Sequence, residues 1–252
     1  MIPTRTHRPP RGFTLIELLL CIAIIAVLVS IILPAMARSK TAARLIRCSA
    51  NLSQIGVANT QYLNDFRGSY AVHQNWASLV GPWGNRPQFY DEKHNTGWEG
   101  EATPGGVEVK IRPLNRYLDH KTVTRCPDDR GDVLQNTRNC YEAYGTSYLP
   151  SWNSENFATA HTTATNADRN HRPMKDFDPR GPQSNKLVMS EWVWHGNRSL
   201  SQPQNLWHNI QVLRQYNILF GDGHAAFFTF PREIEKWFDP KAALPDPARG
   251  WW

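Results

Sequence analysis

The stretch from Arg11 to Pro34, RGFTLIELLLCIAIIAVLVSIILP, decides the fold of this 252-residue chain. A basic leader ends at Gly12, and an almost wholly apolar run then extends from Phe13 to Pro34. Residues 13–33 form about 31 Å of α-helix at roughly 1.5 Å per residue, which matches the hydrocarbon core of a bilayer. We therefore predict a leader over residues 1–12 and a transmembrane helix over residues 13–33.

One charged residue, Glu17, interrupts the apolar run. A carboxylate in lipid costs about 2.5–3.5 kcal/mol at the centre of a helix, so such a charge needs a reason. Cleavage of the chain before Phe13 creates an α-amino group four residues from Glu17, within reach along one helical turn. The ammonium and carboxylate groups can then neutralise each other within or between subunits.

The sequence Gly12–Glu17, GFTLIE, resembles the processing site of type IV pilins and type II secretion pseudopilins. The resemblance implies that a prepilin peptidase cleaves after Gly12 and methylates the new N-terminus at Phe13. It also implies that Glu17 helps the subunit to enter a growing filament. The implied partners are the peptidase, other pilin or pseudopilin subunits and an assembly platform in the inner membrane. A proline further along this segment is common in that family, as Pro34 is here.

Two other interpretations of the N-terminal segment remain open. A secretory signal also has a basic start and an apolar centre, and Ala35–Ala37 supplies an A-x-A cleavage site. Its apolar region usually spans only about 7–15 residues, however. A plain single-span anchor is the other alternative, and it leaves Glu17 without a role.

The charge distribution orients the chain and argues against a nucleic-acid partner. Arg5, Arg8 and Arg11 place the N-terminus in the cytoplasm by the positive-inside rule. The rest of the chain is then expected in the periplasm or another extracytoplasmic space, tethered to the inner membrane by a single pass. Three of the six net positive charges lie in the leader, so the processed chain carries only +3.

The remaining sequence predicts an α+β fold, pilin-like, with a long N-terminal helix packed on an antiparallel β-sheet with long loops. Residues 34–68 form the amphipathic continuation of the helix, which we expect to run over residues 13–66 with a kink at Pro34. A globular β-rich domain follows over residues 69–252. Residues recurring at intervals of three and four mark the packed face of the helix: Leu45, Cys48, Leu52, Ile55, Asn59, Tyr62 and Phe66. The opposite, wetter face carries Arg47, Asn51 and Gln54.

Two β-elements are predicted near the C-terminus. Residues 187–194 form an apolar strand candidate, and residues 216–220 and 224–228 flank the turn sequence Gly221–Gly223. Asp-Gly between apolar strands is a strong hairpin signal. Residues 70–112 and 150–185 are rich in turn-forming residues and predict irregular structure.

The same regions resemble a large subfamily of pilin-like proteins. Cys48 and the following Asn51–Gly56 match its pattern after the anchor, and Cys126–Asp129 matches its Cys-Pro-x-Asp element. Residues 187–191 and 217–224 match its acid-terminated strand and its Asp-Gly hairpin. The upstream histidine of that pattern has its nearest counterpart in His208, which lies fourteen residues before Asp222, a longer gap than in the subfamily. The role of His208 therefore stays open.

The sequence allows the cysteines to be either disulfide-bonded or free thiols. Cys126 and Cys140 lie in a polar, loop-rich region, where a disulfide between them is one hypothesis and two free thiols are the alternative. Such a bond would contribute about 3 kcal/mol by closing a short loop. Cys21 and Cys48 are interpreted as small buried apolar residues.

The acids and histidines do not form a recognisable metal motif. Asp128, Asp129 and Asp132 offer oxygen ligands for calcium, with a solvated turn as the alternative, and they do not follow the EF-hand pattern. A zinc set has no supporting motif among the relevant residues: His195, His208, His224, Glu191 and Asp222. We expect no cofactor other than this calcium candidate.

No nucleophile elbow, P-loop or dinucleotide fingerprint occurs, so no catalytic residue is expected. The sequence favours a structural subunit of a pseudopilus or pilus-like fibre, which serves type II protein secretion or surface attachment. A membrane-tethered domain that binds glycans through some of the ten tryptophans is the main alternative. A metal-dependent hydrolase is a third.

Overall fold

The computed structural model describes residues 14–73, 77, 79–82, 112–151, 164–165, 175–176, 182–208, 213–232 and 234. The leader, Phe13 and most of the two turn-rich regions, with the predictions made for them, lie outside these described residues. The chain divides into two compact units, Met1–Ala43 and Arg44–Trp252.

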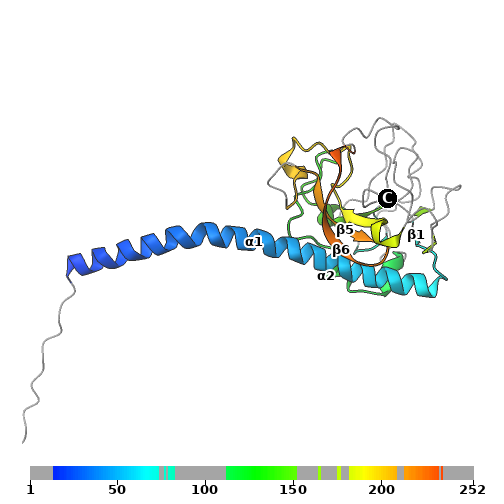
Figure 1. Ribbon diagram of the computed structural model, residues 1–252, viewed down its shortest axis with the longest axis horizontal. Coiled ribbons are helices and arrows are strands. Elements are labelled where there is room, and N and C mark those ends of the chain that lie inside the picture. The colour runs from blue at the N-terminus through cyan, green and yellow to red at the C-terminus, as the bar shows by residue number, and fades with distance from the viewer. Residues whose placement is uncertain are drawn as a thin grey trace, which may run out of the picture. The chain divides into compact units, whose positions relative to one another are not determined.

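A single helix, α1 (Leu15–Asp65), confirms the predicted N-terminal helix with bounds within two residues of those expected. It passes Pro34 without interruption (Figure 1). Every residue of α1 in the first unit is exposed, including the whole apolar run, as at Leu15 with 77% of its surface accessible. This part of α1 is long and apolar enough to cross a membrane.

The second half of α1 buries the predicted face against the globular unit. Its buried residues are Cys48, Asn51, Leu52, Ile55, Gly56, Ala58, Asn59, Tyr62 and Leu63. The two ends of the predicted stripe, Leu45 and Phe66, are half-buried and exposed respectively. Asn51 was expected on the wet face and is instead buried, because its amide donates to the Arg125 carbonyl at 2.8 Å and to the Tyr148 hydroxyl at 3.2 Å.

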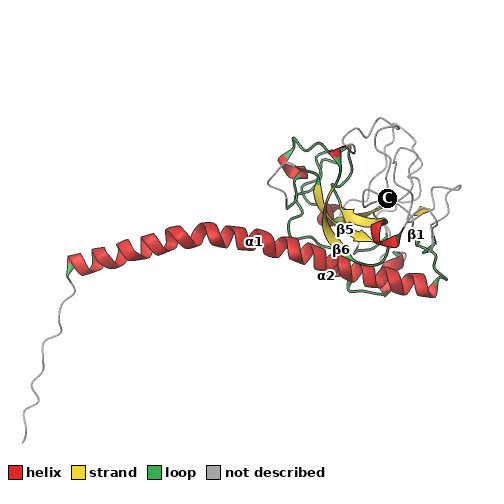
Figure 2. Cartoon of the chain, in the orientation of Figure 1, coloured by secondary structure: helices red, strands yellow, loops and turns green. Residues whose placement is uncertain are grey.

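The core sheet has four antiparallel strands in the order β2–β4–β5–β6. Their bounds are β2 (Tyr148–Pro150), β4 (Leu187–Glu191), β5 (Gln215–Phe220) and β6 (Ala225–Thr229). Figure 2 shows β5 and β6 of this sheet next to each other. A separate parallel pair joins β1 (Val72–His73) to β3 (Ala164–Thr165). The α+β class predicted from the sequence is confirmed.

Short helical turns connect these strands. They are η2 (Pro113–Arg116), α2 (His120–Val123), α3 (Cys140–Tyr144), η3 (Gln183–Asn185) and η4 (Pro203–Asn205). Side chains cap two of them, since Asp119 accepts from the amide of Lys121 and Asn139 accepts from the amide of Glu142. These caps satisfy amides that a helix start leaves without an internal partner.

The predicted hairpin is confirmed as β5 and β6, which register Ile218 opposite Ala226. Gly223 has φ of +90°, a conformation that disfavours side chains larger than glycine's, and the Phe220 amide donates to the His224 carbonyl across the turn at 2.9 Å. β4 and most of β5 are buried, because α1 covers part of the sheet and a tryptophan-rich core surrounds it.

A glycine allows α1 to approach the hairpin. A Cβ atom built on Gly56 would lie 2.7 Å from the Leu219 Cδ1 atom and 2.8 Å from the Gly223 carbonyl oxygen. The second half of α1 and the β5–β6 hairpin therefore lie side by side in the globular unit, as Figure 1 shows.

Candidate functional site

The first turn of α1 holds the Glu17 carboxylate. Glu17 Oε2 accepts hydrogen bonds from the Thr14 amide and the Thr14 hydroxyl, both at 2.8 Å. The Thr14 hydroxyl in turn accepts from the Glu17 amide at 3.3 Å. This reciprocal arrangement is a capping box, in which a carboxylate satisfies free amides at the positive end of a helix. Glu17 therefore has a local partner in the unprocessed chain, while Gly12 and Phe13 lie outside the described residues.

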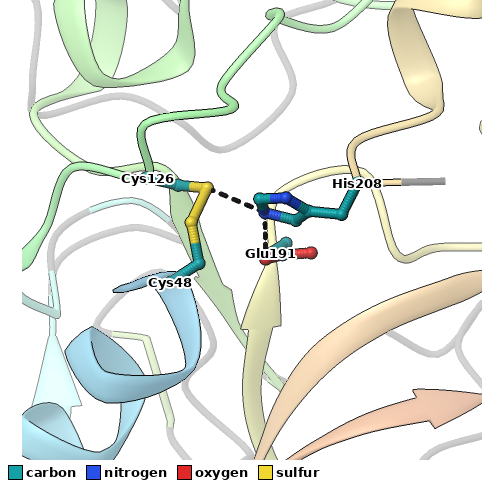
Figure 3. A group of neighbouring side chains, drawn as sticks. All are labelled: Cys48, Cys126, Glu191 and His208. Atoms are coloured by element: carbon teal, nitrogen blue, oxygen red, sulfur yellow. Dashed lines mark hydrogen bonds and ion pairs between the residues drawn. A yellow bond between two sulfur atoms is a disulfide. The ribbon is translucent and has the colours of Figure 1, made fainter. Parts of the chain in front are cut away.

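A second cluster lies inside the globular unit, where four elements bring together Cys48, Cys126, Glu191 and His208 (Figure 3). Cys48 comes from α1, Cys126 follows α2, Glu191 ends β4 and His208 follows η4. All four residues are buried, and their ligand atoms lie within 4.8 Å of one another. Among the described residues, this is the group of histidine, cysteine and acidic side chains arranged to hold a metal ion.

Within this cluster Cys48 and Cys126 form a disulfide. The predicted bond between Cys126 and Cys140 is therefore wrong, and Cys140 is a buried free thiol. Burial, with further contributions from the nearby carboxylates of Asp129 and Asp132, raises the pKa of Cys140 well above its usual value. Cys126 pairs with α1 because the Asn51 amide holds the adjacent Arg125 carbonyl against that helix.

His208 connects the disulfide to two carboxylates. Its Nε2 atom lies 3.2 Å from the Cys126 sulfur and 3.0 Å from Glu191 Oε1. Its Nδ1 atom lies 3.3 Å from Asp128 Oδ2, and the same oxygen accepts the His208 backbone amide at 2.7 Å. His208 has φ of +54°, in the left-handed region that few residues other than glycine adopt, so this hydrogen bond helps to hold an unfavourable backbone conformation.

Glu191 is held by the neighbouring strand. Its Oε1 atom accepts from the Asn217 side-chain amide at 2.7 Å, and its Oε2 atom accepts from the Asn217 backbone amide at 3.3 Å. Burial and the Glu191 charge raise the pKa of the adjacent Tyr148 well above its usual value. The Tyr148 hydroxyl lies 3.4 Å from the Cys48 carbonyl oxygen and remains protonated there.

The three predicted calcium ligands are not gathered into one site. Asp128 pairs with His208 and with the arginines Arg44 and Arg130. Asp129 accepts from the amides of Gly131, Cys140 and Tyr141 and from the Ser147 hydroxyl. Asp132 accepts from Trp192 and Arg198. Each carboxylate is thus occupied by a different set of protein donors.

The predicted histidines also separate. His195 is buried and stacks on Trp194 at a ring distance of 4.0 Å, and burial lowers its pKa well below the usual value. His224 lies on the exposed β5–β6 turn beside Asp222. The five residues considered for zinc therefore form two separate pairs, His208 with Glu191 and His224 with Asp222, and His195 joins neither.

Cys48 was predicted only as a small buried apolar residue and not as a member of this cluster. A cysteine on the packed face of a helix looks like any small apolar residue, so periodicity alone does not identify its partner. The available signal was that Cys48 and Cys126 both belong to the motifs that resemble the pilin-like subfamily.

Comparison with known proteins supports the N-terminal site. A family model described as the prokaryotic N-terminal methylation motif matches residues 8–33. This motif and the long apolar helix are consistent with a type IV pilin-like protein. Neither the curated proteins nor the solved structures provide a match.

Proposed function

We propose that this chain is a structural pilin-like subunit, a pseudopilin, that assembles into a pseudopilus or pilus-like fibre. Prepilin peptidase cleaves it after Gly12 and methylates Phe13. The fibre serves type II protein secretion or surface attachment. The observation that carries this proposal is the methylation motif at residues 8–33, which coincides with an apolar helix segment whose side chains are exposed.

The exposed apolar segment suits both the subunit in the membrane before assembly and the subunit packed in a fibre. A lipid bilayer covers its apolar side chains before assembly, and the same segments of neighbouring subunits cover one another in a fibre. Glu17 is the only charged residue between Phe13 and Met36. After cleavage it has a new ammonium group to pair with, either on its own chain or on a neighbour.

The three described tryptophans do not support the glycan-binding alternative. Trp192, Trp194 and Trp207 are completely buried and fill the core, so none of them offers a ring face to a sugar. The other seven tryptophans lie outside the described residues. The glycan-binding alternative therefore rests on composition alone.

The first test measures the N-terminal mass of the full chain recovered from membranes, with and without a co-expressed prepilin peptidase. We expect a peptide that starts at N-methylated Phe13 only when the peptidase is present. A start at Arg38 in both samples would indicate ordinary signal cleavage and would contradict the proposal.

The second test addresses assembly through Glu17→Gln, which removes the charge and preserves the size of the side chain. We expect processing to continue and fibres to be lost from the sheared surface fraction. Ser30→Ala is the matched control, because the Ser30 hydroxyl donates to the Val27 carbonyl of its own helix and has no other bond within the described part of the chain. Normal fibres from the Glu17→Gln variant would contradict the assigned role of Glu17.

A further inference from the structure

The cluster around the disulfide contains more polar chemistry than a covalent cross-link requires. A disulfide is stable in an apolar core, yet Glu191 and His208 have no solvent-accessible side-chain surface beside it. Moving charged or strongly polar groups from water into such a site is costly unless they gain specific partners. Asn217 donates to both oxygens of Glu191, whereas Nδ1 of His208 has no aligned hydrogen-bond partner among the described residues.

We propose that Cys48, Cys126, Glu191 and His208 are the four ligands of a tetrahedral Zn²⁺ site that forms when the disulfide is reduced. The globular unit then has two alternative cross-links at one place, a disulfide and a zinc ion. This inference does not depend on assembly into a fibre.

The four atoms suit zinc in number and spacing. Zinc bonds of about 2.0–2.3 Å to nitrogen, oxygen and sulfur put neighbouring ligands of a tetrahedron roughly 3.3–3.8 Å apart. The ligand atoms here all lie within 4.8 Å of one another, so small side-chain shifts complete the site once the S–S bond is gone. Two thiolates with an imidazole select zinc over calcium, which prefers oxygen ligands alone.

The surroundings of His208 match those of a metal-bound histidine. In such a histidine the N–H group of the second ring nitrogen commonly donates a hydrogen bond to a carboxylate, which fixes the orientation of the ring. Here Nε2 faces the cluster while Nδ1 lies 3.3 Å from Asp128 Oδ2. Glu191 likewise has a second-layer partner, since Asn217 donates to both of its oxygens.

The proton positions on His208 give an independent argument. In the disulfide form, Nε2 lies 3.0 Å from Glu191 Oε1 and 3.2 Å from the Cys126 sulfur, and Nδ1 has no aligned hydrogen-bond partner among the described residues. With zinc on Nε2, the neutral ring carries its proton on Nδ1, and a small rotation of the ring aligns that N–H with the Asp128 carboxylate 3.3 Å away. Each ring nitrogen then has one partner, zinc or Asp128.

The conversion is balanced as follows. A phosphine reductant and one water become the phosphine oxide, and the two electrons cleave the S–S bond into two thiols, which take up the two water protons. Zinc then binds both sulfurs, and the two thiol protons are released to solvent. Glu191 supplies a carboxylate oxygen and His208 supplies the lone pair of Nε2, so no further redox change occurs.

The test uses the full chain in detergent micelles, reduced with a phosphine and titrated with Co²⁺ as a spectroscopic substitute for Zn²⁺. We expect binding of one ion per chain, with a thiolate-to-cobalt charge-transfer band and the intense visible bands of tetrahedral cobalt. Added Zn²⁺ should remove these bands. The oxidised chain should bind neither ion at this site.

Variants identify the ligands. His208→Ala should weaken Co²⁺ binding at least a hundredfold, and Asp128→Asn should weaken it about 10–100-fold through its effect on His208. His224→Ala and Cys140→Ala are matched controls, because His224 is exposed and Cys140 lies outside the cluster. Circular dichroism of the oxidised variants checks their folding, since the disulfide still holds them.

Three results would overturn the proposal. The first is a reduced, folded chain that binds no stoichiometric metal. The second is equal loss of binding in His208→Ala and His224→Ala. The third is a reduced chain that unfolds and does not refold with excess Zn²⁺, because a structural zinc site supplies folding free energy on binding.

Discussion

At the scale of single residues, Asp132 shows how buried charge is stabilised in the globular unit. Its Oδ2 atom accepts from Arg198 Nε and Nη2 at 3.1 and 2.7 Å and from Trp192 Nε1 at 3.0 Å. Asp132→Asn leaves the buried guanidinium without its counter-charge, so we expect the free energy of unfolding to fall by about 3–5 kcal/mol. Urea denaturation of the full chain in micelles, followed by tryptophan fluorescence, measures this change.

Asp222→Asn is the control for that substitution. Asp222 is also paired, with His224, but its side chain is 41% exposed. Exposed ion pairs contribute about 0–1 kcal/mol, so the free energy of unfolding should change little. An equal loss of unfolding free energy in both variants would show that the stabilisation by the Asp132–Arg198 pair does not come from its burial.

His195 predicts a pH dependence of stability. Burial lowers its pKa in the folded chain, with further lowering by Arg198 and Arg214, whereas the unfolded chain has the ordinary value of about 6.5. As pH falls below about 6.5, the unfolded state takes up a proton that the folded state excludes. The stability contribution is therefore complete above that pH and declines by about 1.4 kcal/mol per pH unit below it.

The variant His195→Phe tests this dependence while preserving an aromatic ring against Trp194. We expect the free energy of unfolding to fall less steeply between pH 6.5 and 5 than in the unmodified chain. Val193→Ala, a neighbouring buried substitution, should lower stability at every pH and leave the slope unchanged. If the free energy of unfolding of His195→Phe falls with pH as steeply as that of the unmodified chain, His195 is not the source of this pH dependence.

At the scale of elements, the contact between α1 and the hairpin depends on Gly56. Alanine favours helix by about 1 kcal/mol over glycine, but its Cβ would meet the Gly223 carbonyl oxygen at 2.8 Å. A backbone oxygen does not move as easily as a side chain, so we expect Gly56→Ala to destabilise the globular unit by about 1–3 kcal/mol. Gln54→Ala, on the exposed face, should be neutral or slightly stabilising in the same urea titration.

Local patterns predicted these elements well. The interval of three and four residues located the buried face of α1, and Asp-Gly between apolar runs located the β5–β6 hairpin, because both signals act over a few residues. The prediction that Asn51 lies on the wetter face of the helix was wrong, because the partners of its side chain are distant in sequence. Its polar side chain is buried through bonds to the Arg125 carbonyl and the Tyr148 hydroxyl, which lie 74 and 97 residues away in sequence.

At the scale of the whole molecule, the cluster was not predictable from spacing. Cys48 and Cys126 are separated by 78 residues, and Glu191 and His208 come from two further elements. The hypothesis of a bond between Cys126 and Cys140 rested on their position in one polar, loop-rich region of the sequence. Tertiary packing decided otherwise, since α1 brings Cys48 to Cys126 and α3 directs Cys140 into the core.

The Cys48–Cys126 bond predicts how strongly α1 is held by the globular unit. Cys48 is the first buried residue of α1, so the bond fixes the helix at the point where its burial begins. Closing a loop with a separation of 78 residues stabilises the folded state by about 4–5 kcal/mol. The double substitution Cys48→Ala and Cys126→Ala should therefore lower the free energy of unfolding by that amount under oxidising, metal-free conditions. Cys140→Ala, which removes a buried sulfur without opening a cross-link, should cost about 1 kcal/mol. If the double variant loses no more than Cys140→Ala, packing rather than the covalent bond holds α1 in place.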